Sequence, residues 1–187
     1  FSPCWLSVAT ATVCERPSAA MRFLSKSKLI AFRQCPKRLW LEIHRPELRE
    51  DSAGTLASFQ VGYQVGDIAR RIYDPEEKGQ VIDVKTEGFD AAFTRSARLL
   101  ADSAEPIFEA GFKAGGGLAF ADVMLPVIEN GERAWQMVEV KSSTSVKDYH
   151  REDVAVQAFI AQAAGVTVKS VVLACIDSSW VYPGEKD

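Results

Sequence analysis

Residues 121–141 read ADVMLPVIENGERAWQMVEVK, a stretch that predicts a β-hairpin. Asn130 and Gly131 lie between two apolar runs of the kind found in strands. A two-residue type I′ turn needs a positive φ at both central positions, and an Asn-Gly pair adopts that conformation readily. The turn therefore sets the register of the two strands, in which Glu129 faces Glu132.

The same register brings acidic side chains together at the far end of the hairpin. Counting back along both strands places Asp122 directly opposite Glu139, and Lys141 lies two residues further along on the same face. Two opposed carboxylates repel each other, and a divalent cation between them would remove the repulsion. The alternative interpretation is a surface ladder of ion pairs, because charged cross-strand pairs are common.

The hairpin has two chemically different faces. One face is predicted to pack on the core and consists of Ala121, Val123, Leu125, Val127, Val138 and Val140. The other face consists of Asp122, Met124, Trp135, Met137, Glu139 and Lys141. Exposure to solvent alone does not explain why polar residues gather at one end of a largely apolar face.

The pattern along the rest of the chain predicts an α/β fold. Helices are predicted over residues 26–34, 37–43, 55–73, 89–101 and 148–164. Strands are predicted over residues 81–84, 107–113, 118–128, 133–141 and 170–176, and the last is apolar throughout, as buried strands are. The order of helix, three strands, helix and strand, with further helices in front, predicts a mixed sheet flanked by helices.

Composition and charge limit the class of protein. The 187 residues are 47% hydrophobic and 25% charged, which are globular values. No run of about 18 apolar residues is present, so no membrane partner is expected. Residues 21–49 carry eight Lys/Arg against two Glu, whereas the whole chain has a net charge of −3. The asymmetry therefore indicates a basic helical docking segment over 21–50, in front of an acidic body over 51–187. The alternative is an ordinary solvated helix face.

The first twenty residues and the cysteines add two expectations. Residues 1–20 are small and apolar, Met21 opens a more ordinary protein start, and we interpret 1–20 as an upstream extension. The four cysteines are Cys4, Cys14, Cys35 and Cys175. Their spacing indicates neither a zinc site nor a disulfide framework, so a reducing, cytoplasmic compartment is expected. Nothing in the sequence predicts an oligomeric state.

Three parts of the sequence resemble known nucleases. Asp122 followed by Glu139-Val140-Lys141 resembles the D…(E/D)xK signature of the PD-(D/E)XK nuclease superfamily. Residues 139–157, EVKSSTSVKDYHREDVAVQ, are similar to its RecB-type branch, in which a glutamine on the next helix completes the site. Residues 21–48, MRFLSKSKLIAFRQCPKRLWLEIHRPEL, resemble an uncharacterised group of longer bacterial proteins and the CRISPR-adaptation exonucleases.

The resemblance implies a restriction-endonuclease-like αβββαβ core and metal-assisted hydrolysis of phosphodiester bonds in DNA. Asp122, Glu139 and the backbone carbonyl of Val140 would hold Mg²⁺ or Mn²⁺, which prefer oxygen ligands. Lys141 would orient or deprotonate the attacking water and stabilise developing charge. Gln157 would fix the water or a phosphate, and its alternative role is helix packing. DNA against RNA, and single-stranded against double-stranded DNA, stay undecided.

The basic segment supplies the candidate nucleic-acid-binding residues. These are Lys26, Lys28, Arg33, Lys37 and Arg38, which would contact phosphates without reading bases. Cys35 matches one ligand of a four-iron cluster found in some relatives, so either a longer form supplies the other cysteines or this protein has no cluster.

Three positions depart from the family pattern or stay outside it. The histidine that RecB-type relatives often carry before the sheet is replaced by Gly66-Asp67, with Asp67 as the candidate substitute. The branch motif QxxxY becomes Gln157…Ala161. His150 is expected at the surface. The missing histidine motivates an alternative function, that of a catalytically inactive nuclease core that binds nucleic acid or assembles a longer protein.

Overall fold

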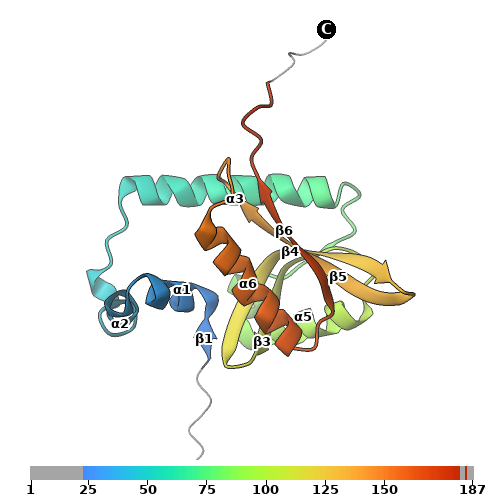
Figure 1. The fold of residues 1–187 in the computed structure, drawn as a ribbon, viewed down its shortest axis with the longest axis horizontal. Coiled ribbons are helices and arrows are strands. Elements are labelled where there is room, and N and C mark those ends of the chain that lie inside the picture. The colour runs from blue at the N-terminus through green and yellow to red at the C-terminus, as the bar shows by residue number, and fades with distance from the viewer. Residues whose placement is uncertain (1–22, 182–183, 185–187) are drawn as a thin grey trace, which may run out of the picture.

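The computed structural model describes residues 23–181 and 184 (Figure 1). Its elements are β1 (Leu24–Ser25), α1 (Lys26–Gln34), α2 (Pro36–His44), the 3-10 turn η1 (Pro46–Leu48), α3 (Ala53–Tyr73), β2 (Gln80–Val81), α4 (Val84–Glu87), α5 (Phe89–Asp102), β3 (Ile107–Ala114), β4 (Gly117–Glu129), β5 (Glu132–Lys141), α6 (Asp148–Ala163) and β6 (Val168–Cys175).

The strands form one mixed sheet in the order β2-β3-β4-β5-β6, and β1 pairs with β4 off this path. The central β3, β4 and β5 are antiparallel, whereas β1, β2 and β6 each pair in parallel with their neighbour. Helices flank the sheet, so the predicted α/β class is confirmed. The run α5-β3-β4-β5-α6-β6 has the predicted order of helix, three strands, helix and strand.

Helices on the two faces of the sheet enclose two apolar clusters. Ala92 of α5 and Ile160 of α6 pack with Phe112 and Met137 of the sheet in the larger cluster. The smaller cluster joins buried residues of β3, β4 and β5 to Tyr73 of α3. In Figure 1, α6 crosses the sheet, α3 runs along the top of the view, and α1 lies beside α6, with α2 on its far side. The candidate residues of the hairpin therefore lie between α6 on one side and α3 on the other.

Two predicted strands need correction. The strand predicted over 81–84 is only Gln80–Val81, because Asp83 begins the short helix α4, its side chain accepting from the Lys85 backbone N–H at 3.0 Å. The strand predicted to be buried is β6, which lies at an edge of the sheet, with Val171 38% and Val172 37% exposed. An apolar strand is thus not always a central one.

The face assigned to Ala121 is wrong. Ala121 packs in the larger cluster with Met124, whereas Val123 lies in the smaller cluster on the other face. The side-chain alternation slips at Asp122, which lies across from Glu109 between two paired positions of β3 and β4. Glu109 has a φ of +58°, and this left-handed conformation interrupts the regular alternation of the strand pair.

Some of the sequence expectations concern residues that are not described. Residues 1–20, including Cys4 and Cys14, lie outside the described range. Within residues 23–181 and 184, no helix has the length and apolar character needed to cross a membrane.

Candidate active site

The predicted hairpin register is confirmed. Asn130 and Gly131 have φ values of +53° and +83°, and the paired residues run from Glu129 with Glu132 to Val123 with Val138. Beyond that pair, a side chain replaces the backbone ladder, because the Val140 N–H donates to Asp122 Oδ2 at 2.7 Å. Asp122 is thereby fixed beside the last residues of β5.

Glu139 lies in a cluster of alternating charges, which we call the charge ring and define as Lys26, Glu139, Lys141 and Asp153. Glu139 Oε1 accepts from Lys141 Nζ at 2.7 Å and from Lys26 Nζ at 3.2 Å. Asp153 contacts the same two ammonium groups, Lys141 through Oδ2 at 2.5 Å and Lys26 through Oδ1 at 3.0 Å. The ring combines side chains from α1, β5 and α6, and its four formal charges cancel.

Helix α6 supplies the opposite wall of this site. Gln157 is fully buried and its Nε2 donates to Glu139 Oε2 at 2.6 Å, while its Oε1 has no hydrogen-bond partner among the described residues. Asp153 lies four residues earlier, on the same face of the helix. His150 shares this face and is only 3% exposed, so its predicted surface location is wrong. Burial, together with the nearby Lys141 and Lys147, lowers the pKa of His150 and keeps it neutral.

Two carboxyl groups of the site, those of Asp122 and Glu109, have raised pKa values. Burial, and next the charge of Glu139, raise the pKa of Asp122 to about 7 despite its hydrogen bond from Val140. Burial also raises the pKa of half-buried Glu109, although Arg70 lies 4.0 Å from it. Asp122 therefore holds its proton more tightly than an ordinary carboxyl group does.

The pKa values of Lys141 and Asp153 in the charge ring are shifted so that both groups stay charged. Burial by itself would lower the pKa of Lys141, but Glu139 and Asp153 raise it above its ordinary value. Burial would likewise raise the pKa of Asp153, and the charges of Lys26 and Lys141 bring it below its ordinary value. Lys141 is thus protonated at neutral pH and Asp153 is ionised.

The donor chemistry around Asp122 fits a hard divalent cation. Two carboxylates and the unpartnered Gln157 Oε1 are oxygen donors of the type that Mg²⁺ and Mn²⁺ use. No three His, Cys, Asp or Glu side chains meet as a metal-binding group in the described part of the chain. The predicted ligand set has two carboxylates and one backbone carbonyl. It contains only two side chains of these types, so it would not form a group of three.

A cleft of about 390 Å³ opens between α3 and the site. Asp122 and Lys141 line its sheet side, and Phe59, Tyr63 and Arg70 line its α3 side. Asp67, the predicted replacement for the family histidine, also lines this cleft. Its side chain is 66% exposed and lies 3.7 Å from Arg70, so it is not fixed against Asp122.

The candidate nucleic-acid-binding residues of the basic segment lie in different environments. Lys28 and Lys37 are exposed and have no ion pair within the described residues. Arg33 pairs with Glu152 at 2.9 Å and Arg38 pairs with Glu42 at 2.8 Å, both at the surface. Lys26 points instead into the charge ring.

Cys35, the candidate cluster ligand, is exposed between α1 and α2. The one other cysteine within the described range is Cys175, which is partly buried in β6. The structure therefore brings no second cysteine of that range into the position of a cluster ligand beside Cys35.

Sequence reasoning missed three residues of the site. Asp153 could have been found, because it lies one helical turn before Gln157. Lys26 was assigned to phosphate contacts, and its place in the charge ring depends on tertiary packing that no local motif encodes. Glu109 lies across from Asp122 in a left-handed backbone conformation that has no sequence signature here.

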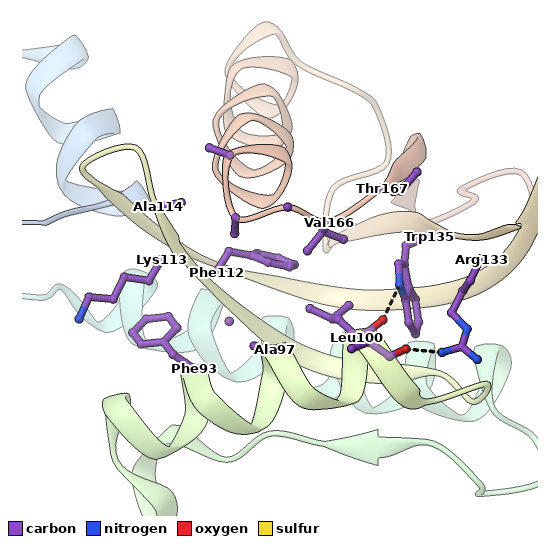
Figure 2. A pocket seen from close by; sticks show the side chains of 15 residues that line it. Phe93, Ala97, Leu100, Phe112, Lys113, Ala114, Arg133, Trp135, Val166 and Thr167 are labelled. Carbon is purple, nitrogen blue, oxygen red and sulfur yellow. Dashed lines mark hydrogen bonds between the residues drawn. The ribbon is translucent and has the colours of Figure 1, made fainter.

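A second cleft, of about 600 Å³, lies away from the charge ring (Figure 2). Phe93 and Leu100 of α5, Phe112 of β3 and Trp135 of β5 form much of its apolar lining. Trp135 Nε1 donates to the Leu100 carbonyl at 3.2 Å, which ties β5 to the end of α5. None of the predicted site residues lines this cleft.

Neither a scan against protein-family models nor a search of curated proteins finds a match to this chain.

Proposed function

We propose that this chain is a metal-dependent nuclease of the PD-(D/E)XK superfamily, RecB-type branch, that hydrolyses phosphodiester bonds of DNA. DNA repair, recombination or defence would be its setting, in the cytoplasm. The observation that supports the proposal most is that Lys141 and Gln157 both donate to Glu139, while Asp122 accepts the backbone N–H of the next residue, Val140. These residues come from β4, β5 and α6 of an αβββαβ arrangement.

Each residue has a defined chemical task in the proposal. Asp122, Glu139 and the Val140 carbonyl would hold Mg²⁺ or Mn²⁺, which when bound would polarise a phosphoryl oxygen and lower the pKa of an attacking water. Lys141 would orient that water and stabilise negative charge on the phosphate, because its raised pKa favours the ammonium form over a general base. Gln157 would accept a hydrogen bond from the water through its unpartnered Oε1.

The surroundings of the site suit a nucleic-acid strand. The cleft along α3 reaches Asp122 and Lys141, and exposed Phe59 and Tyr63 offer flat faces for bases. The exposed Lys28 and Lys37 would contact phosphates further along the strand.

The test is cleavage of single-stranded and duplex DNA in Mg²⁺ or Mn²⁺, with a chelator as the blank. We expect the wild type to cleave only with the cation. Lys141→Ala should lower the rate by roughly 100-fold or more, the loss seen when one charge-stabilising donor is removed. Lys78→Ala is the matched control, because Lys78 is an exposed lysine that pairs with Glu76. Equal cleavage by Lys141→Ala and the wild type would place the activity at another site.

A second candidate function is an inactive nuclease core that binds nucleic acid or assembles a longer protein. The observation that favours it is that donors from Lys26, Lys141 and Gln157 already occupy both oxygens of Glu139. In that case DNA would bind equally well with cation or chelator and would not be cleaved.

A further inference from the structure

Lys26 belongs to the charge ring, yet the proposed chemistry gives it no task. Its ammonium group contacts Glu139 Oε1 at 3.2 Å and Asp153 Oδ1 at 3.0 Å, and its side chain is only 22% exposed. Glu139 is also a proposed cation ligand. A positive side chain therefore sits on the oxygen that a divalent cation would need.

Two separate contacts in the fold position Lys26 near Glu139. Leu24 and Ser25 of β1 pair in parallel with Gly117 and Leu118 of β4. Ser25 then caps α1, its Oγ accepting from the Lys28 backbone N–H at 3.4 Å. Lys26 is thus the first residue of a helix anchored to the sheet, so its position near Glu139 is built into the fold.

Asp153 provides Lys26 with a second ionic partner if Lys26 leaves Glu139. Asp153 binds the two lysines through different oxygens, Oδ1 for Lys26 and Oδ2 for Lys141. Lys26 can therefore release Glu139 and keep one ionic partner, while Lys141 keeps its own. Without Asp153, displacement of Lys26 would leave a partly buried ammonium without a counter-ion, which is costly.

We propose that Lys26 competes with the divalent cation for Glu139 and so sets the cation concentration at which the site fills. Asp153 retains Lys26 in the filled state. This inference rests on the proposed nuclease function, because it concerns the same cation site.

The experiment is calorimetric titration of Mn²⁺ into the whole chain without DNA, at fixed pH and ionic strength. The variants are Lys26→Met, Lys26→Gln and, as the matched control, Lys28→Met, which removes one positive charge from an exposed position of the same helix. Both Lys26 variants should bind Mn²⁺ roughly tenfold or more tightly than the wild type, because repulsion at contact distance is removed. Lys28→Met should differ from the wild type by less than about twofold, because an exposed charge is screened. Circular dichroism and thermal melting verify that each variant is folded.

The possible failures are distinguishable. If the wild type binds Mn²⁺ and both folded Lys26 variants bind it equally or more weakly, the competition is disproved and the nuclease proposal stands. An equal gain in Lys28→Met would also disprove it, since the effect would then be one of net charge. If neither the folded wild type nor the folded Lys26 variants bind Mn²⁺, the cation site and this inference fail together.

Discussion

The two ends of the β4–β5 hairpin are fixed in different ways. At the turn end, the positive φ values of Asn130 and Gly131 set the pairing through backbone geometry alone. At the other end the ladder stops, and the Asp122 carboxylate accepts the Val140 N–H in place of a backbone carbonyl. Local conformation thus determines the register, whereas the site depends on side chains that α1 and α6 bring to the strands.

Asp122→Asn gives the largest expected change in stability. The pKa of Asp122 in the folded protein, about 7, lies above its ordinary value of 3.8, so ionisation opposes folding. Stability contributed by the neutral carboxyl is complete below about pH 4 and is lost as the pH rises through 7. The asparagine variant should be more stable than the wild type by roughly 2–4 kcal/mol at about pH 8. Its side-chain oxygen can still accept the Val140 N–H.

Chemical denaturation of both proteins over this pH range measures the difference, which should vanish near about pH 4. The same variant should bind Mn²⁺ much more weakly, because an amide is a poorer ligand than a carboxylate. A constant difference in unfolding free energy at all pH values would contradict the buried, repelled carboxylate.

Glu139→Ala should cause the second-largest change in stability. It leaves the buried Gln157 Nε2 without its acceptor and removes one partner from each lysine of the charge ring. We expect a loss of about 2 kcal/mol in unfolding free energy, the cost of leaving buried polar groups unpaired. Glu105→Ala, at an exposed position, is the control and should change stability little. An equal effect of the two substitutions would mean that the ring contributes nothing to stability.

A glycine exchange tests the turn end. Gly131→Ala should lower the unfolding free energy by about 1 kcal/mol, because a side chain disfavours the left-handed conformation. Gly62→Ala is the matched control, since Gly62 lies inside α3 and the methyl group of an alanine there would point into open space. It should instead raise stability by roughly 0.5–1 kcal/mol. Equal signs for the two variants would contradict the type I′ turn.

The smallest effect on stability is expected for Lys37→Ala, at an exposed position of α2. Stability should change by less than about 0.5 kcal/mol. Affinity for DNA should weaken to a similar degree for every sequence, and the slope of affinity against salt should fall by roughly one. Fluorescence anisotropy at several salt concentrations measures both. An unchanged salt slope would remove the basic segment from the proposed interface.

Sequence patterns predicted the parts of the fold that depend on neighbours along the chain. The Asn130-Gly131 turn, the register it sets and the helix that carries Gln157 all follow from short-range chemistry. The face of Ala121 did not follow, because the left-handed Glu109 lies on another strand and interrupts the alternation there. Which apolar strand lies at the edge was likewise unreadable, as Val171 and Val172 of β6 show.

In the candidate site too, only the features that depend on neighbours along the chain were predictable. Asp122, Glu139 and Lys141 follow from the register, and Asp153 could have been added from its spacing to Gln157. Lys26 could not, because its contacts with Glu139 and Asp153 join residues more than a hundred positions apart in the sequence. Long-range pairing of this kind depends on how β1 is placed beside β4.

Anomalous diffraction from crystals soaked in Mn²⁺ tests the central claim most directly. The account predicts an anomalous peak bonded to the carboxylates of Asp122 and Glu139 in the wild type, and its loss in Asp122→Asn. Wild-type crystals that show no peak there at saturating Mn²⁺, or a peak only at another site, would contradict the proposed metal-dependent chemistry.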